Sequence, residues 1–348
     1  MKKLIATILC LVLCVGVLAA CGQDTPGEGQ TQTSGTPGDA ALNEDYYFTM
    51  GSTMTSTALI TPLIQEACDN INEKTDGHVT IDFFPDSTLG ADTEMFSQMQ
   101  NGELDFLNTG IMAKTSINEY GFLTGYWWME DMDHFWAVWN SEIGERYQQV
   151  MEEDYNTHQV CATLLGQHNL ISTKPIKTLD DFNGRQLRIS SNPAAVELWT
   201  AIGVNVNIMP WGEVIPSLQT GVIDTVGHTY QQFYDTGLQE LASYLTETNH
   251  EADITCIYAC NDTWNSLPDE YRKIIQEEFD ACFAEFDSIR DASMEEAKQA
   301  LIDAGLEYTV LDPEVRAEIT EIMKPVLQEI FETTWTGATY EEVMSYAD

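Results

Sequence analysis

The sequence predicts an α/β fold of two lobes, each with its own β-sheet, connected by one long helix. Its 348 residues exceed the roughly 250 to 300 at which a single hydrophobic core stops growing. Strands alternate with amphipathic helices in two separate stretches, and this alternation is typical of sheets covered by helices. A third stretch, residues 267–305, has a helical pattern too long for one small lobe.

The first alternation covers residues 45–110. Its expected strands are 45–52, 78–85 and 103–110, and its expected helices are 60–71 and 91–102. In the first helix the apolar residues recur at helical spacing, and in the second strand they alternate with polar ones. Strands separated by helices in this way favour a parallel sheet with both faces covered.

The same alternation returns over residues 186–228. Here the expected strands are 186–190, 204–209 and 222–228, and the expected helices are 192–203 and 210–221. The two stretches share no detectable sequence repeat. They therefore predict two α/β lobes rather than a duplicated unit.

Residues 267–305 carry an apolar stripe on one helical face and contain no breaker between Pro268 and Gly305. A helix of about 39 residues is about 58 Å long at 1.5 Å per residue. We expect it to run along both lobes and brace them. The alternative is a pair of helices broken near Asp291.

The chain is strongly acidic, with 15 Lys+Arg against 56 Asp+Glu and a formal net charge of -41. Such a charge repels nucleic acid and anionic membrane surfaces, so neither is an expected partner. The acid excess is typical of a solvated extracytoplasmic surface.

The first 20 residues have the layout of an export signal. Lys2 and Lys3 precede an apolar run that is too short to span a bilayer comfortably, and a small-residue pair precedes Cys21. This pattern resembles a bacterial lipobox, which implies cleavage before Cys21 and lipidation of that residue. Residues 21–42 then read as the lipidated cysteine and a flexible tether. The mature chain keeps 13 basic and 56 acidic residues, a net charge of -43.

No catalytic or metal motif is present. The sequence contains no GxSxG, GxxxxGK[ST], HExxH or GxGxxG pattern, and the six histidines are scattered singly. Five cysteines remain after the anchor, an odd number that argues against a disulfide scaffold, and Cys256 and Cys260 lack the partners of a zinc site. We therefore expect no catalytic residues, no metal site and no cofactor, and favour a binding protein over an enzyme.

Arg188 is the clearest candidate for binding. It alternates with Leu187 and Ile189 in an expected strand, so its side chain points to the opposite face. A guanidinium offers a rigid fork of donors that fits a carboxylate bidentately. From the strand alone, a structural salt bridge with one of the many acids is the favoured interpretation.

The segments KPIKTLDDFNGRQLRISSN and AIGVNVNIMPWGEVIPSLQTGVIDTV resemble the central signature of the solute-binding subunits of TRAP (tripartite ATP-independent periplasmic) transporters, the DctP type. FFPDSTLGADTEMFSQMQNGELDF and WNSLPDEYRKII add two further blocks in family order. The likeness covers nearly everything from about residue 45 onward.

This resemblance implies a periplasmic-binding-protein-like fold that closes on a small organic acid, with Arg188 gripping the carboxylate. We expect lobe I to comprise residues 43–165 and 253–293, and lobe II residues 166–252 and 294–348. The expected partners are the organic acid and the small and large membrane subunits of a TRAP transporter. The expected location is outside the cytoplasm, at a membrane to which the chain is lipid-anchored.

The resemblance also suggests further ligand-binding residues, and each has an alternative as plain packing. His168 and His228 stand where sialic-acid-binding members carry arginine and asparagine, which argues against that ligand. Trp211 falls where an aromatic ring often covers the solute. The remaining candidates are Thr53, Asp92, Thr109 and Trp127.

Two other functions stay open from the sequence. One is a ligand-sensing lobe that feeds a signalling protein, and the other is a surface-anchored hydrolase. Which carboxylate is bound, and whether a cation assists, do not follow from the residues.

Overall fold

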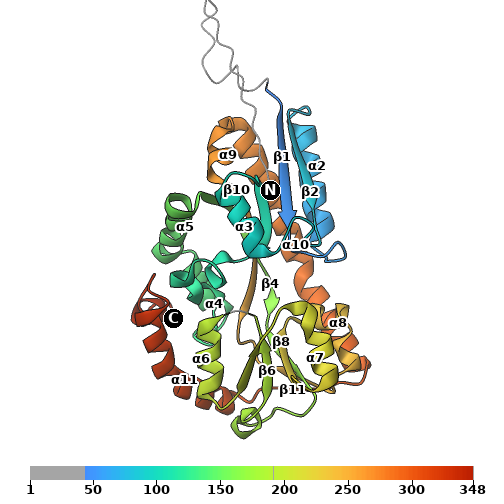
Figure 1. The fold of residues 1–348 in the computed structure, drawn as a ribbon, viewed down its shortest axis with the longest axis vertical. Helices are drawn as coiled ribbons and strands as arrows, with labels where there is room; N and C mark the ends of the chain where they lie inside the picture. The colour runs from blue at the N-terminus through green and yellow to red at the C-terminus, as the bar shows by residue number, and fades with distance from the viewer. Residues whose placement is uncertain (1–43, 191, 348) are drawn as a thin grey trace, which may run out of the picture. The chain divides into compact units, whose positions relative to one another are not determined.

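The structure is a computed structural model that describes residues 44–190 and 192–347. The expected signal segment 1–20, Cys21 and the tether 21–42 lie outside these residues. The described part contains two β-sheets with helices packed around them (Figure 1). Within it, no helix combines the length and the apolar character needed to cross a membrane.

The first sheet has five strands in the order β2-β1-β3-β10-β4. Strand β1 runs parallel to both β2 and β3, whereas β10 is antiparallel to β3 and β4. The strands are β1 (Tyr46–Ser52), β2 (Val79–Phe84), β3 (Phe106–Gly110), β4 (Thr157–Gln167) and β10 (Ala252–Cys260).

The second sheet has six strands in the order β11-β9-β5-β8-β6-β7. Strand β6 runs parallel to β7 and β8, and β11 parallel to β9, whereas β5 is antiparallel to both of its neighbours. The strands are β5 (Asn169–Ser172), β6 (Gln186–Ile189), β7 (Asn205–Ile208), β8 (Thr225–His228), β9 (Tyr244–Glu247) and β11 (Glu307–Val310).

The expected strands of each alternating stretch pair in parallel, as predicted, but further antiparallel strands make both sheets mixed, so neither whole sheet is parallel. The cause is that the chain passes from sheet to sheet along strands: β4 continues through His168 into β5, and β9 continues through residues 248–251 into β10. The two crossings are hydrogen-bonded to each other, with His168 N–H to the Glu251 carbonyl at 2.8 Å and His250 N–H to the His168 carbonyl at 3.2 Å.

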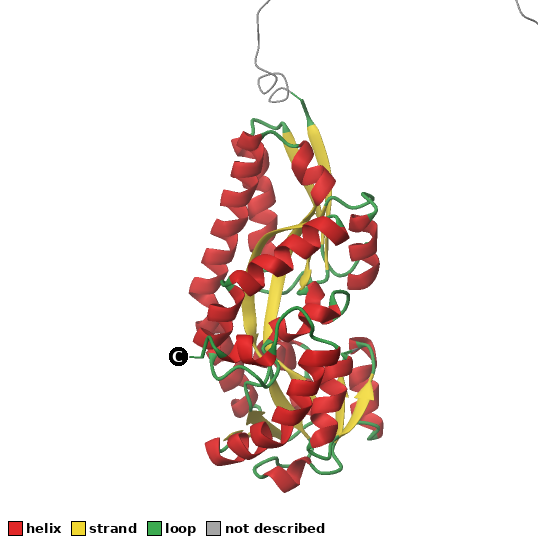
Figure 2. Cartoon of the chain, turned by 90° about the vertical axis from the view of Figure 1, so that its left-hand side faces the viewer, coloured by secondary structure: helices red, strands yellow, loops and turns green. Residues whose placement is uncertain are grey.

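The expected helices and strands of both alternating stretches are confirmed, with ends shifted by a few residues, and helices lie on both sides of the strands (Figure 2). The described α-helices are α2 (Thr61–Lys74), α3 (Asp92–Gln100), α4 (Met132–Trp139), α5 (Glu142–Tyr155), α6 (Pro193–Ala201), α7 (Val214–Thr220), α8 (Tyr230–Asp235), α9 (Asn261–Ser266), α10 (Asp269–Asp303), α11 (Pro313–Thr333) and α12 (Tyr340–Met344).

Helix α10 is a single helix of 35 residues, so the alternative break near Asp291 is wrong. Its first half, including Phe279, packs in a core with α2 and the strands of the first sheet. Its second half, including Leu301, packs in a core with α8 and the second sheet. The helix therefore ties the two sheets together, as expected.

The five cysteines of the described residues are free thiols. Cys68, Cys256, Cys260 and Cys282 are buried and Cys161 is half-buried. Burial raises the pKa of the Cys256 and Cys282 thiols to about 12, because a thiolate is poorly solvated there. These cysteines act as small apolar core residues.

Candidate ligand-binding site

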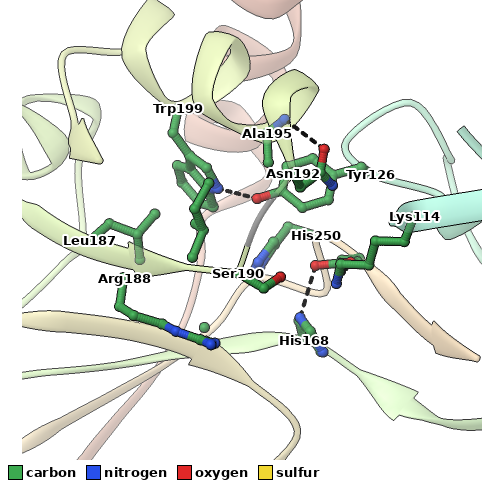
Figure 3. A pocket seen from close by; sticks show the side chains of 13 residues that line it. Lys114, Tyr126, His168, Leu187, Arg188, Ser190, Asn192, Ala195, Trp199 and His250 are labelled. Carbon is green, nitrogen blue, oxygen red and sulfur yellow. Dashed lines mark hydrogen bonds and ion pairs between the residues drawn. The ribbon is translucent and has the colours of Figure 1, made fainter. Parts of the chain in front are cut away.

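A cavity with about 350 Å³ of empty space lies where the two crossings meet the second sheet (Figure 3). Its wall combines cationic, acidic and aromatic side chains from several elements. The polar and aromatic residues that define it are Lys114, Tyr126, His168, Arg188, Trp199, His250 and Glu251.

Arg188 lies in β6, the strand next to the edge of the second sheet, between β7 and β8. Figure 3 shows Leu187 on one side of this strand and Arg188 on the other, as the alternation predicts. The Arg188 side chain is buried, with Nε and Nη2 donating to the Met209 carbonyl at 3.1 and 3.0 Å. Its guanidinium also lies over the Trp211 ring, 5.1 Å from the centroid.

Within residues 44–190 and 192–347, no carboxylate lies within 4 Å of the Arg188 guanidinium. The alternative that Arg188 forms a structural salt bridge within these residues is therefore wrong. Burial lowers the pKa of Arg188 to about 10, partly offset by the charge of Glu251, so the group remains a cation at neutral pH. It is a buried charge that faces a cavity without a counterion.

His168 lies at the first crossing, between β4 and β5. Its Nδ1 is 2.9 Å from Glu251 Oε2, and its Nε2 is 3.5 Å from Asp253 Oδ2. Burial favours the neutral ring, but the two acids outweigh it and raise the pKa of His168 to about 9. His168 is thus an imidazolium at neutral pH.

Glu251 binds two cations at once, because Lys114 Nζ contacts its other carboxylate oxygen. Burial alone would raise the pKa of Glu251, but Lys114 and His168 hold it well below its usual range. Lys114 follows β3 in a short 3₁₀ turn (Met112–Lys114), so this ion pair joins the first sheet to the second crossing.

His228 ends strand β8, and its ring lies 4.7 Å from that of His168 and 5.0 Å from that of Trp211. Burial, then the nearby positive charge of His168, lowers the pKa of His228 to about 3. Trp211 thus contacts both Arg188 and His228. These three residues and His168 are brought together from four separate segments of the chain.

The candidates from the first alternating stretch lie apart from this cavity. Asp92 lines a second cavity, also with about 350 Å³ of empty space, which shares Lys114 and Glu251 with the first. Thr53 and Thr109 follow and end strands β1 and β3, where their hydroxyls bond to each other at 3.1 Å. They do not appear among the lining residues of either cavity.

Trp127 lies one layer behind the cavity wall. Its side chain is 1% exposed and stacks on His250, with ring centroids 5.7 Å apart. The Arg316 guanidinium lies over the Trp127 ring, 5.3 Å from its centroid. Its neighbour Tyr126 forms the wall instead, with its hydroxyl bonded to Trp199 Nε1. The backbone of Trp127 has a φ of 58°, an unusual conformation for a bulky residue that the surrounding contacts must hold.

Sequence reasoning missed Lys114, Tyr126, Trp199, His250 and Glu251 as wall residues. His250 and Glu251 lie between two strands that the sequence did not predict, β9 and β10. The one available signal was local: His250 and Glu251 form a polar pair directly before the apolar run of β10.

Two α/β sheets joined by crossing strands, with a buried unpaired cation in a cavity at the crossings, define a two-lobed solute-binding protein. The chain belongs to the DctP family, described as bacterial extracellular solute-binding protein, family 7, whose family model matches residues 50–334. Members of this family are extracytoplasmic solute-binding proteins rather than enzymes.

Characterised relatives agree with this membership. A solute-binding protein of Chromohalobacter salexigens is 26% identical over 72% of this chain and 74% of its own length. The C4-dicarboxylate-binding periplasmic protein DctP of Shewanella loihica is 27% identical over 74% of this chain and 76% of its own. An ectoine/5-hydroxyectoine-binding periplasmic protein of Ruegeria pomeroyi is 26% identical over 73% of this chain and 76% of its own.

Solved structures share the fold. A TRAP periplasmic solute-binding protein from Desulfovibrio salexigens, with bound orotic acid, has a TM-score of 0.77 at 22% identity and covers 87% of this chain and 98% of its own. One from Shewanella oneidensis, with bound succinate, has a TM-score of 0.78 at 20% identity, covering 87% and 100%.

Proposed function

We propose that this chain captures a small organic acid in the cavity at the crossings and delivers it to a TRAP-type membrane transporter. The observation that carries the proposal is Arg188, a buried guanidinium that faces the cavity with only a backbone carbonyl and an indole ring as partners. A buried cation without a counterion is costly, and a ligand carboxylate would offset that cost.

The charges around the cavity favour an acid with one carboxylate. Lys114 and protonated His168 are two cations, and they are matched by the two acids Glu251 and Asp253. Arg188 remains as one unmatched positive charge. A second carboxylate on the ligand would lie close to the two acids without a cation of its own.

The named ligands of similar proteins support this class. Four matched structures are described with orotic acid, d-glucuronate, L-galactonate and succinate, and each of these molecules carries a carboxylate. Two others are described with sn-glycerol-3-phosphate, an anion that carries a phosphate instead. Because of the charges around the cavity, we expect this chain to bind an acid with one carboxylate in preference to a dicarboxylate such as succinate.

The other expected site residues take supporting roles in this proposal. Trp211 covers Arg188, while His168 and His228 supply polar contacts beside it. Asp92 lines the adjoining cavity, and Thr53 and Thr109 shape the ends of β1 and β3 near it. Trp127 acts from behind the wall by holding His250.

The test compares the binding of a panel of organic acids to the parent chain and to Arg188→Ala. Thermal shift and calorimetry measure the binding. Losing the paired charge-assisted hydrogen bonds, about 1.5–3 kcal/mol each, should weaken binding at least about 10-fold and in practice abolish the shift. Arg272→Ala is a matched control, because Arg272 pairs with Asp269 on exposed helix surface. Equal shifts in the parent and Arg188→Ala would sink the proposal.

We propose that delivery depends on the closure of two lobes. Lobe I comprises residues 43–165 and 253–293, and lobe II comprises residues 166–252 and 294–348. The proposed receivers are the small and large membrane subunits of a TRAP transporter. Membership of the two sheets supports this division. Trp335, which follows α11, nevertheless packs against Phe122, so this segment contacts the first lobe as well.

We further propose that Cys21 is lipidated and that residues 21–42 tether the folded part to a membrane. The support is the lipobox-like sequence before Cys21. In an expressing bacterium, the parent should fractionate with membranes and incorporate labelled fatty acid, whereas Cys21→Ser should do neither. Equal membrane retention of the two chains would contradict the anchor.

A further inference from the structure

Three of the six histidines of the chain lie around one point beside the cavity. The His168 ring is 4.7 Å from that of His228 and 6.0 Å from that of His250. They come from the first crossing, from β8 and from the second crossing, so the clustering arises from the fold and not from sequence spacing.

Asp253 completes a set of three metal-ligating side chains in this cluster. One ligand atom from each of His168, His228 and Asp253 lies within 4.8 Å of the other two. The Asp253 carboxylate has ion-pair contacts at 3.5 Å to His168 Nε2 and at 3.8 Å to His228 Nδ1, and it faces the second cavity.

The His168 Nε2 atom is the second observation that indicates a ligand. The His168 side chain is more than nine-tenths buried, and Nε2 has no hydrogen-bond partner, because its contact with Asp253 lacks the geometry of a hydrogen bond. A buried ring nitrogen is rarely left in this state, since the missing bond costs about 1–3 kcal/mol.

The opposite nitrogen of the same ring is already fixed. His168 Nδ1 bonds to Glu251 at 2.9 Å, and Lys114 holds the other oxygen of Glu251. Histidines that bind metal commonly use a carboxylate in this way, because it orients the ring. The ion would displace the proton that Nε2 carries in the imidazolium form, so metal binding at His168 releases one proton.

We propose that His168 Nε2, His228 and Asp253 form a binding site for a divalent transition metal ion of the zinc class. Two imidazoles and one carboxylate suit Zn²⁺, Co²⁺, Ni²⁺ or Cu²⁺ better than Ca²⁺ or Mg²⁺, which prefer oxygen ligands. Coordination through His228 Nδ1 would replace the hydrogen bond that this atom accepts from Thr229 N–H at 2.9 Å.

The site leaves a coordination position for the solute. His228 and Arg188 both contact the Trp211 ring, so an ion bound to His228 would lie near the guanidinium. Provided that the proposed function holds, an acid on Arg188 that carries a second oxygen donor, such as a 2-hydroxy acid, gains a metal contact that a simple acid lacks.

The test is calorimetric titration of the full chain, stripped of metal by a chelator, with ZnCl₂ alone. The expected result is saturable binding of one ion per chain. His228→Gln and Asp253→Asn should each weaken it at least about 10-fold, the scale of losing one member of a metal site. His158→Gln is the control, because His158 is a histidine that pairs with a carboxylate, Glu152 at 2.7 Å, on a different part of the chain.

Visible absorption with Co²⁺ gives a measurement on the parent chain that needs no variant. Imidazole coordination should produce intense bands that excess Zn²⁺ removes. The absence of these bands together with no saturable Zn²⁺ binding overturns the proposal, as does Zn²⁺ binding unchanged in both variants. Arg188→Ala separates the two claims, because it should lose acid binding in the absence of metal and still bind Zn²⁺.

Discussion

At the scale of single residues, the arginines near β6 show how one residue type serves two purposes. Arg185 is buried and donates to the carbonyls of Asp181 and Pro175, both in the loop that leads into β6. Arg188, three residues on, points to the cavity. The first stabilises the approach to the strand, and the second carries its unmatched charge to the proposed ligand.

The conformation of the segment before β6 also depends on Asp181. Its carboxylate accepts hydrogen bonds from the N–H groups of Lys177 and Thr178, and the Thr178 side chain completes a capping box on the 3₁₀ turn Leu179–Phe182. Partial burial acts to raise the pKa of Asp181, but these hydrogen bonds and the charge of Arg185 leave it lowered overall. This carboxylate therefore stabilises the fold in its ionised form.

We predict that Asp181→Ala lowers the free energy of unfolding by about 1 kcal/mol at pH 7, the usual size of a lost cap. Because the pKa of Asp181 is lowered on folding, its contribution is present above the usual aspartate pKa of 3.8 and is lost as pH falls through the lower pKa of the folded state. Urea unfolding of parent and variant should thus converge below pH 3.8. A constant difference from pH 7 to pH 3 would contradict this account.

At the scale of elements, the two sheets depend on α10 and on the crossings. The Phe279 end of α10 belongs to one core and the Leu301 end to the other, so the exposed turn around Ala292 carries the connection between them. The two halves of α10 stay aligned only if the backbone hydrogen bonds of the helix continue through this turn.

Ala292→Pro should therefore destabilise the protein by about 3 kcal/mol or more, because proline removes a helical hydrogen bond and clashes with the preceding turn. Ala292→Gly is the matched control, with an expected loss of about 1 kcal/mol from helix propensity alone. Urea unfolding measures both. Equal losses would mean that the helix is not continuous through this turn in solution.

At the scale of the whole molecule, an anion must reach a cation inside a strongly acidic chain. The chain has 15 basic and 56 acidic residues, and the field of this excess opposes an approaching carboxylate. The cations Arg188, Lys114 and His168 attract it only locally, once it is near the cavity.

Association of the organic acid should therefore become faster as salt is added, because a screening length of about 8 Å at physiological salt removes the long-range repulsion first. Stopped-flow measurement of the association rate from low to moderate NaCl concentration tests this. Slower association with salt would show that the local field of the cavity already dominates at the molecular surface.

The sequence by itself determined the local elements and the class of the protein. Apolar spacing predicted α2, α6 and α10 and strands β1 to β3 and β6 to β8, because periodicity and breakers are local properties. The alternation around Arg188 predicted its direction, and the resemblance of residues 174–226 to the family signature led to the prediction that it binds a ligand carboxylate.

Tertiary structure alone decided which side chains meet. Strands β5, β9 and β10 form the crossings, and their antiparallel pairing depends on partners far along the chain. His168, His250 and Glu251 therefore look like isolated polar residues in the sequence, but the two crossings bring them within hydrogen-bonding distance. Local patterns encode where a strand begins, whereas the surroundings of a buried charge depend on pairings between distant segments.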